Sequence, residues 1–426
     1  MSENRKNKRG VMTRVLHSGW RSDPVTGAFG LPIYPTAGYE FRSASHAAEL
    51  FALETAGHIY SRLSNPTVSA FEETLADMEG GVAAVATSSG QAALSLLVMA
   101  LASPGDHIVV SRTSYGGTLT LLKNLLGRYG LEIEALDFNH PCCVQNAIKE
   151  NTRAILCEAI GNPVMNVAPL ESLAGLAKRS GIPFVVDNTF SPVLCSPLEW
   201  GADVVLYSTT KYISGLGHVL GGAIVDGGRF DWGADDRWAS LNRPDPAYHG
   251  VVFTERFGAS ALSAKIRTSL MRDLGACPSP FDSYLLRQSL ATLPLRMKRH
   301  SENAQTIAEF LENHPAVSSV SYPGLSSHPQ HDLARQYLVG GFSGMISCEL
   351  AGGYEAGVRF LENTGLFAHV ANVGDARSMA IHSASTTHSQ LTAEERAAAG
   401  IGEGMIRLSV GLEDVEDLVA DLKGAL

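Results

Sequence analysis

The chain has 426 residues, of which 45% are hydrophobic and 18% charged, and its formal net charge is −10. This composition is typical of a globular protein with two or three domains. The acidic balance disfavours nucleic acid and anionic membranes as partners, and every apolar run is too short to span a bilayer. Because no apolar segment follows the polar residues 1–9, we expect a short disordered tail, no secretory signal and a cytoplasmic protein.

The six cysteines predict neither a disulfide framework nor a metal site. None forms a CxxC pair, and none has a histidine at the spacing of a zinc site. Cys157 and Cys348 lie in apolar, strand-like runs, where cysteine is a small buried hydrophobe. We therefore expect a reducing compartment and no bound metal.

The first half of the chain alternates between strand-like and helix-like segments. Residues 1–60 show no strong period, Asp23–Tyr39 is typical of an extended arm, and Asn65-Pro66 marks a helix start. The predicted helices are Ala70–Glu79, Gln91–Ala102, Thr118–Tyr129, Cys142–Lys149 and Leu170–Ser180. The predicted strands are Val82–Ala86, His107–Ser111, Leu131–Leu136, Arg153–Glu158, Ile182–Asp187, Asp203–Tyr207 and Gly222–Val225. This order predicts βαβ units and a mostly parallel sheet.

The pattern changes at Arg229–Gly258, which is rich in Asp, Trp, Pro and Tyr and is expected to be an irregular insertion. A long helix over Ser283–Leu311 should break near Pro294, because proline lacks the backbone N–H that a helix interior needs. Short strands and helices then alternate again up to an amphipathic helix over Glu413–Leu426. We expect an N-terminal arm over residues 1–65, a large domain over 66–280 and a smaller α/β domain over 281–426.

Polar residues follow three predicted strands at the edge where open α/β sheets bind ligands. The small-residue loop Thr87–Ala92 opens a helix, whose free N–H groups suit a phosphate. Asp187 closes a hydrophobic strand, where a carboxylate needs a cationic partner. Lys211 comes after Ser208-Thr209-Thr210, at the end of the next strand.

Each of these residues alone has a simpler explanation, because a lone lysine is usually solvated and a strand-end aspartate usually caps a helix. Their order after successive strands favours one ligand with a phosphate, a protonatable ring nitrogen and an aldehyde. Pyridoxal 5′-phosphate (PLP) carries all three groups. We therefore predict PLP as the cofactor, bound to Lys211 as a Schiff base and paired with Asp187 through its pyridine nitrogen.

The run Val186–Gly215 (VDNTFSPVLCSPLEWGADVVLYSTTKYISG) resembles the signature of the Cys/Met-metabolism PLP-dependent family. The resemblance extends from about Leu16 to the C-terminus. It implies PLP-dependent transferase fold type I, the aspartate-aminotransferase-like fold, with a mostly parallel central sheet and a smaller C-terminal domain. It also implies a homo-oligomer, usually a dimer of dimers.

The resemblance further implies roles for single residues. Lys211 and Tyr115 become the catalytic acid/base groups, and Tyr115 also stacks on the cofactor ring. Arg407 becomes the clamp for the substrate carboxylate, assisted by Asn372, and Asn162 contacts the phenolic oxygen of PLP. The implied phosphate-binding residues are Gly90, Gln91, Ser208 and Thr210, together with Tyr60 and Arg62 from the neighbouring subunit.

Within the family, several features resemble the O-acetylhomoserine sulfhydrylases. They are the segments Ala247–Gly258 and Arg272–Phe281, the segment Ala371–Leu391, and Gly116, where methionine γ-lyases usually have a cysteine. Three positions depart from the sulfhydrylase pattern, which commonly has histidine at Tyr207 and Leu216 and proline at Ser383.

The subgroup resemblance implies γ-replacement on an O-acylated homoserine, in particular O-acetyl-L-homoserine. Sulfide or a thiol would be the second substrate, and homocysteine or a thioether plus acetate the products. Two alternatives keep the same residues: a methionine or homocysteine γ-lyase, and a γ-elimination of the cystathionine γ-synthase or lyase type. A non-catalytic scaffold is disfavoured by the complete set Lys211, Asp187 and Arg407, and a Rossmann enzyme by the lack of GxGxxG after the first strand.

Overall fold

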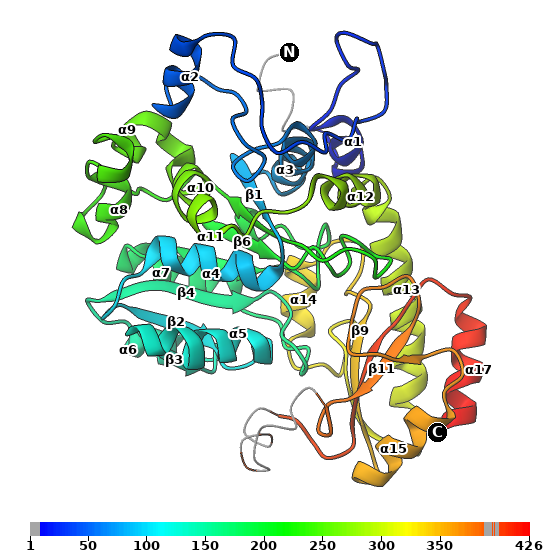
Figure 1. Cartoon of the computed structure of the whole chain (residues 1–426). Helices are drawn as coiled ribbons and strands as arrows, with labels where there is room; N and C mark the ends of the chain where they lie inside the picture. The colour runs from blue at the N-terminus through cyan, green and yellow to red at the C-terminus, as the bar shows by residue number, and fades with distance from the viewer. Residues whose placement is uncertain (1–8, 387–393, 395, 397–399) are drawn as a thin grey trace.

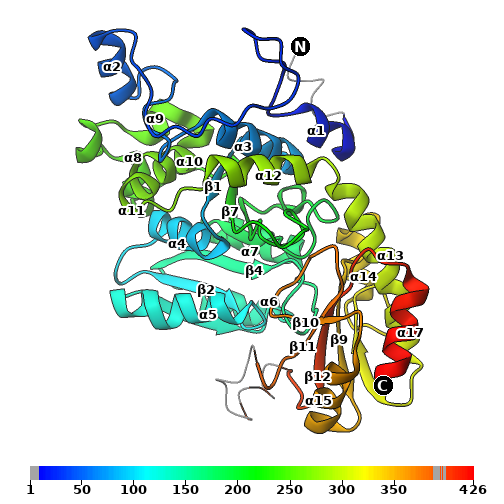
Figure 2. The same ribbon diagram turned by 45° about the vertical axis from the view of Figure 1, so that its right-hand side comes forward.

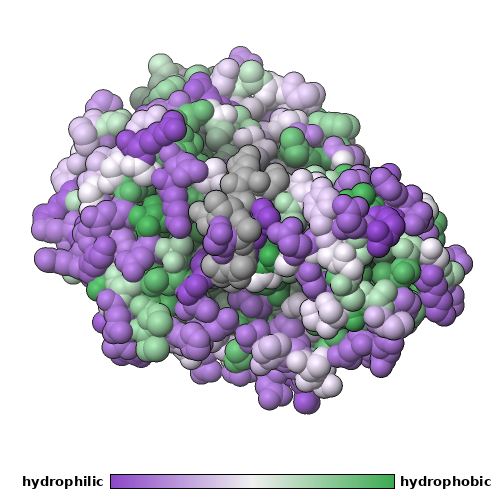
Figure 3. Space-filling view, turned by 90° about the horizontal axis from the view of Figure 1, so that it is seen from below, coloured by the Kyte–Doolittle hydropathy of each residue, from purple (hydrophilic) through white to green (hydrophobic). Residues whose placement is uncertain are grey.

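The computed structural model describes residues 9–386, 394, 396 and 400–426 (Figure 1). The expected N-terminal tail, up to residue 8, and the end of the Ala371–Leu391 segment lie outside the described residues. In this part of the chain no helix combines the length and the apolar character needed to cross a membrane. Figure 3 shows one face of the molecule, on which hydrophilic residues predominate and apolar residues are scattered between them.

A seven-stranded sheet forms the centre of the larger part of the molecule, in the order β1-β7-β6-β5-β4-β2-β3. All neighbouring pairs are parallel except those of β7, which is antiparallel to β1 and β6. The strands are β1 (Ala83–Thr87), β2 (His107–Ser111), β3 (Glu132–Leu136), β4 (Thr152–Glu158), β5 (Phe184–Asp187), β6 (Val204–Tyr207) and β7 (Gly222–Asp226). They match the predicted strands to within two residues at either end, so the predicted mostly parallel sheet is confirmed.

Helices cover both faces of this sheet, because its strands are apolar on both sides. In β4, Ile155 and Cys157 belong to the core on one face, whereas Ala154 and Leu156 belong to the core on the other. The helices on the first face include α3 (Pro66–Glu79), α7 (Leu170–Ser180) and α12 (Pro280–Leu290). The second face is covered by α4 (Gly90–Leu101) and by α8 (Ala239–Asn242), α9 (Phe253–Phe257) and α10 (Ala261–Lys265).

A second sheet, in the order β10-β11-β12-β9-β8, lies beside the first with its own core (Figures 1 and 2). Its strands are β8 (Val317–Ser321), β9 (Met345–Leu350), β10 (Ala368–His369), β11 (Met379–His382) and β12 (Met405–Ser409). The helices packed in that core are α13 (Leu293–Glu312), α15 (Gly353–Asn363) and α17 (Val415–Ala425), while α14 (His331–Tyr337) faces the large sheet. The mostly parallel central sheet and the smaller C-terminal α/β part are thus as predicted.

Several predicted elements need correction. Residues 1–60, in which the sequence shows no strong period, contain α1 (Val11–His17) and α2 (Ala44–Phe51). The predicted helix Thr118–Tyr129 is split into α5 (Gly116–Thr120), a π-helical turn and a 3₁₀ turn. The insertion Arg229–Gly258 is not fully irregular, because short helical turns bury Trp238, Leu241 and Phe253.

The break in the long C-terminal helix falls at residues 291–292, between α12 and α13. Pro294 lies in the first turn of α13, where a missing N–H removes no hydrogen bond of the helix. The proline therefore starts the second helix and does not interrupt the first.

Candidate active site

A cavity of about 330 Å³ lies at the carboxyl edge of the large sheet, against β12 and the loop before β11. This is the edge at which open α/β sheets bind ligands. Ten of the predicted site residues line it: Gly90, Gln91, Tyr115, Asn162, Asp187, Ser208, Thr210, Lys211, Asn372 and Arg407. The remaining lining residues are Ser89, Leu94, Thr118, Glu158, Ile160, Thr189, Phe190, Leu220, Ala371 and Val373.

The N-terminus of α4 opens into this cavity. Ser89 caps the helix by accepting a hydrogen bond from the backbone N–H of Ala92 at 3.1 Å. A Cβ on Gly90 would lie 2.9 Å from the Cβ of Ser208, so a glycine is needed for the helix to approach the loop after β6. The N–H groups of this helix start and the hydroxyl group of Ser208 thus lie together, which suits a phosphate. The hydroxyl of Thr210 exchanges hydrogen bonds with the backbone of Gly221.

Asp187 ends β5 with its carboxylate in the cavity. Its Oδ1 accepts a hydrogen bond from the backbone N–H of Thr189 at 2.9 Å. Burial raises the pKa of Asp187, and within the described residues no cationic side chain forms an ion pair with it. A buried carboxylate without a cation fits a ligand that brings one, such as a protonated pyridine nitrogen.

Lys211 lies in the turn after β6, and its Nζ donates a hydrogen bond to Asn372 Oδ1 at 2.6 Å. Burial, and to a smaller extent the positive charge of Arg407, lowers the pKa of Lys211 to about 8. A substantial fraction of this amine is therefore neutral near physiological pH. Neutral amine is the form that attacks an aldehyde and accepts a proton.

Arg407 lies in the middle of β12 with only 5% of its surface exposed. Its Nη1 donates a hydrogen bond to Asn162 Oδ1 at 2.9 Å, and burial lowers its pKa to about 10. No carboxylate of the described segments forms an ion pair with this guanidinium. Because guanidinium groups bind carboxylates in a bidentate manner, Arg407 can receive the carboxylate of an amino acid.

Tyr115 lies at the mouth of the cavity with 48% of its surface exposed. A Cβ on Gly117 would lie 2.4 Å from its ring, so a glycine there leaves room for the ring. Its backbone N–H donates a hydrogen bond to Glu158 Oε1 at 2.6 Å. Glu158 was not among the predicted site residues, although its position at the end of the strand beside that of Asp187 could have indicated a site residue.

Tyr60 and Arg62 do not line the cavity of their own chain. Arg62 donates a hydrogen bond to the carbonyl oxygen of Arg272 at 2.7 Å, and its guanidinium lies 5.4 Å from the centre of the Tyr60 ring. Tyr60 is 43% exposed. Their predicted contribution to a neighbouring subunit stays a prediction.

The three departures from the sulfhydrylase pattern also lie outside the cavity lining. The hydroxyl of Tyr207 contacts Glu79 and Asn188 in the core behind the sheet. Leu216 is exposed, and Ser383 is buried after β11. None of the three side chains therefore alters the groups that face the cavity.

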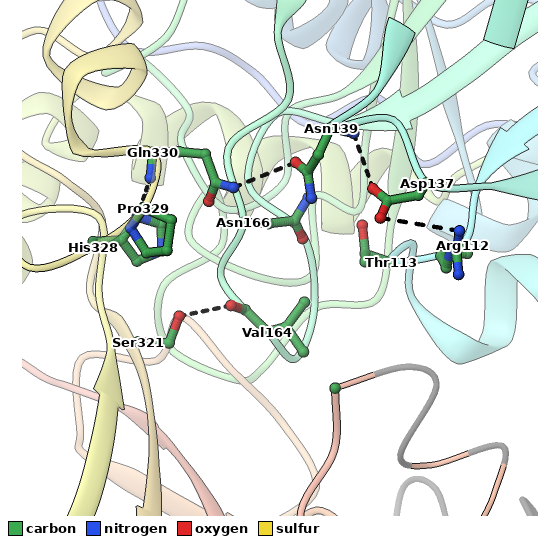
Figure 4. Close-up of a pocket in the computed structure, with 11 residues that line it drawn as sticks. Arg112, Thr113, Asp137, Asn139, Val164, Asn166, Ser321, His328, Pro329 and Gln330 are labelled. Carbon is green, nitrogen blue, oxygen red and sulfur yellow. Dashed lines mark hydrogen bonds and ion pairs between the residues drawn. The ribbon is translucent and has the colours of Figure 1, made fainter. Parts of the chain in front are cut away.

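A second crevice, of about 250 Å³, lies between the end of β3 and the loop before α14 (Figure 4). Gln330 Nε2 donates a hydrogen bond to Asn139 Oδ1 at 3.4 Å, and Ser321 Oγ donates one to the carbonyl oxygen of Val164 at 2.7 Å. Both contacts join a loop that follows a strand of the large sheet to the segment that runs from the end of β8 to α14. In this crevice Arg112 Nη2 lies 4.0 Å from Asp137 Oδ2, and both side chains are partly exposed. This crevice lacks the unpaired buried charges of the first cavity.

A helix start suited to a phosphate, an uncompensated carboxylate and a partly neutral lysine converge on one cavity, and PLP satisfies all three. The fold and the cavity together define a PLP-dependent enzyme of fold type I. The chain belongs to the Cys/Met metabolism PLP-dependent enzyme family, whose family model matches residues 12–426.

Relatives and solved structures resemble the chain over nearly its full length. O-acetyl-L-homoserine sulfhydrylase 1 of Thermus thermophilus is 47% identical over 97% of this chain and 99% of its own. Homocysteine synthase of Schizosaccharomyces pombe is 44% identical over 97% of each chain. The Campylobacter jejuni structure designated O-acetylhomoserine (thiol)-lyase, which contains N'-pyridoxyl-lysine-5'-monophosphate, superposes with a TM-score of 0.95, at 39% identity and 98% and 99% coverage.

Proposed function

We propose that the enzyme catalyses γ-replacement on O-acetyl-L-homoserine with sulfide or a thiol. The observation that carries this proposal is the placement of Lys211 and Arg407 in one cavity, where Lys211 donates a hydrogen bond to Asn372 and Arg407 donates one to Asn162. An amino acid whose carboxylate binds Arg407 presents its Cα to the amine of Lys211. The sulfhydrylase and homocysteine synthase relatives support the choice of this substrate.

The cofactor site that we propose joins four kinds of contact. Lys211 would carry PLP through its amine, and Asp187 would pair with the pyridine nitrogen. Gly90, Gln91, Ser208 and Thr210 would bind the phosphate, and Asn162 would contact the phenolic oxygen. When bound, PLP supplies the electron sink that acidifies the hydrogens on the substrate Cα and Cβ.

With its amine free, Lys211 would remove the Cα proton of the bound substrate as the general base. Loss of a Cβ proton allows the Cγ–O bond to break, and acetate leaves with the bonding electrons. Sulfide forms the new Cγ–S bond, and the protons return to Cβ and Cα through Lys211 or Tyr115. The net reaction consumes one O-acetylhomoserine and one hydrogen sulfide and yields one homocysteine and one acetic acid.

The apolar part of the lining supports replacement over hydrolysis. Leu94, Ile160, Phe190, Leu220 and Val373 face the cavity together with the reacting groups. Such a lining limits access of water to an activated substrate while it accepts a small thiol.

The active form of the enzyme that we propose is a homo-oligomer, built as a dimer of dimers. Tyr60 and Arg62 would reach the phosphate of the neighbouring copy, because neither lines the cavity of its own chain. The exposed side chains Val25 and Phe29, at 90% and 88% exposure, would pack on the partner as part of the arm over residues 1–65. The large domain over 66–280 and the small domain over 281–426 would close around the site. All six cysteines are free, which suits a cytoplasmic location.

A substrate panel tests the reaction. O-acetyl-homoserine, O-succinyl-homoserine, cystathionine and methionine are each supplied with and without sulfide, while homocysteine, keto acid and ammonia are measured. We expect homocysteine from O-acetyl-homoserine only when sulfide is present. Keto acid and ammonia release that is undiminished without sulfide would instead establish a γ-lyase.

A further inference from the structure

Two carboxylates, those of Glu158 and Asp187, lie side by side in the cavity. Glu158 ends β4 and Asp187 ends β5, and the two residues are direct partners in the parallel register. Partners in register project their side chains from the same face of a sheet. Both side chains accordingly line the same cavity.

Each carboxylate accepts a hydrogen bond from the backbone of a nearby loop. Glu158 Oε1 accepts from Tyr115 at 2.6 Å, and Asp187 Oδ1 accepts from Thr189 at 2.9 Å. Neither carboxylate has an ion-pair partner in the part of the chain that the structure describes. One protonated ring nitrogen brings a single positive charge, which balances only one of the two. Two adjacent carboxyl groups in a buried site share their protons unequally, so one of them keeps a proton.

We propose that Glu158 is a positioning residue that works as a neutral carboxylic acid, holding the main chain of Tyr115 against the cavity and leaving Asp187 as the single negative charge there. The inference rests on the roles proposed above for Asp187 and Tyr115. It concerns Glu158 because only this carboxylate is bonded to the segment that carries the tyrosine ring.

The electrostatic surroundings agree with this assignment of the proton. Burial raises the pKa of Glu158 well above its usual range, and the neighbouring charge of Asp187 raises it further. The backbone hydrogen bonds from Tyr115 and Asn162 oppose this rise but are smaller. The pKa of Asp187 is also raised by burial, yet both the side chain and the backbone of Thr189 lower it.

The same chemical change at the two positions provides the test. Glu158→Gln and Asp187→Asn each replace a carboxyl group by a carboxamide of nearly equal shape, and Glu158→Ala removes the acceptor altogether. The purified full-length variants are compared for the Kd of PLP with the apoenzyme, for the visible spectrum of the bound cofactor and for kcat. Circular dichroism of each apoenzyme reports whether the variant folds.

A glutamine keeps the acceptor for the Tyr115 N–H and carries no charge. We expect Glu158→Gln to change the Kd of PLP and kcat by less than about threefold and to keep the native spectrum. We expect Glu158→Ala to weaken PLP binding about tenfold, because the N–H of Tyr115 loses its partner. Asp187→Asn should lower kcat about 100-fold or more and shift the spectrum, since it removes the charge opposite the ring nitrogen.

Equal losses in Glu158→Gln and Asp187→Asn would overturn the inference, because Glu158 would then act as an anion. Native behaviour of Glu158→Ala would also overturn it, since the contact with Tyr115 would have no effect. If Glu158→Ala does not fold, the comparison of the two carboxamide variants still decides the question. A harmless Asp187→Asn would refute the proposed role of Asp187 itself, an outcome separate from failure at Glu158 alone.

Discussion

The two walls of the cavity differ in charge. The wall formed by the strand ends of the large sheet carries a carboxylate without a cation, Asp187, whereas the wall formed by the small sheet carries a guanidinium without an anion, Arg407. The wall with Asp187 therefore lacks a positive charge, which the ring nitrogen of a cofactor would bring. The wall with Arg407 lacks a negative charge, which the carboxylate of a substrate would bring. Lys211 bridges them, since it belongs to the first wall and donates to Asn372 of the second. This difference in charge shows how one cavity can hold a cofactor against one wall and a substrate against the other.

Removing the amine of Lys211 should have the largest effect on activity. We expect Lys211→Ala to lower kcat by about 10³-fold or more, because it removes the amine that we propose both as the attachment of PLP and as the general base. The band of lysine-bound PLP in the visible spectrum should vanish, while circular dichroism stays native. Substantial turnover in this variant would refute the assignment of Lys211.

Removing the cation of the substrate wall should have the next largest effect. We expect Arg407→Ala to raise KM for O-acetyl-homoserine about 100-fold and to leave the Kd of PLP within about threefold of native. Arg335→Ala is a matched control, because Arg335 is exposed on α14. If Arg407→Ala raised the Kd of PLP as much as the KM for O-acetyl-homoserine, the two walls would not have separate roles.

The charge of Arg407 should also affect the pKa of Lys211. The pKa of Lys211 is lowered to about 8, so its amine is protonated below this pH and neutral above it. We expect the rate of PLP capture by the apoenzyme to rise with pH up to about 8 and then to level off. In Arg407→Met the midpoint should move to higher pH, because a positive charge that favours the neutral amine is lost. Stopped-flow absorbance measures the rate of PLP capture at each pH. An unchanged midpoint would show that the charge of Arg407 does not affect the pKa of Lys211.

The smallest effect is expected at the arm. We expect Arg62→Ala to raise the Kd of PLP about tenfold through loss of a phosphate contact, with KM for the amino acid little changed. Arg42→Ala offers a comparison, since Arg42 is an exposed arginine of the same arm. Mixing Arg62→Ala with Lys211→Ala subunits sharpens the test, because a shared site predicts that mixed dimers regain one intact site. Native PLP affinity in Arg62→Ala would contradict the shared-site proposal.

Much of the large sheet could be predicted, because its signals are local. In Phe184–Asp187 the first three residues are apolar and buried, as expected for a strand covered on both faces. Helix starts at Asn65 and Ser89 were marked by their capping side chains. The short turns around Trp238 and Phe253 could not be predicted, because they are stabilised by burial against the sheet and carry no periodic pattern.

The sequence by itself determined that Asp187 ends one predicted strand and that Lys211 follows the end of the next, and therefore that a carboxylate and an amine should meet at one edge of a sheet. The tertiary structure decided how the other side chains of the site are paired. Arg407 meets Asn162 across 245 positions of the chain, Glu158 binds the loop of Tyr115 across 43, and Tyr207 turns away from the cavity toward Glu79. The physical reason is that strand and helix patterns depend on neighbours in sequence, whereas the pairing and the protonation of buried polar groups depend on which distant segments pack against them.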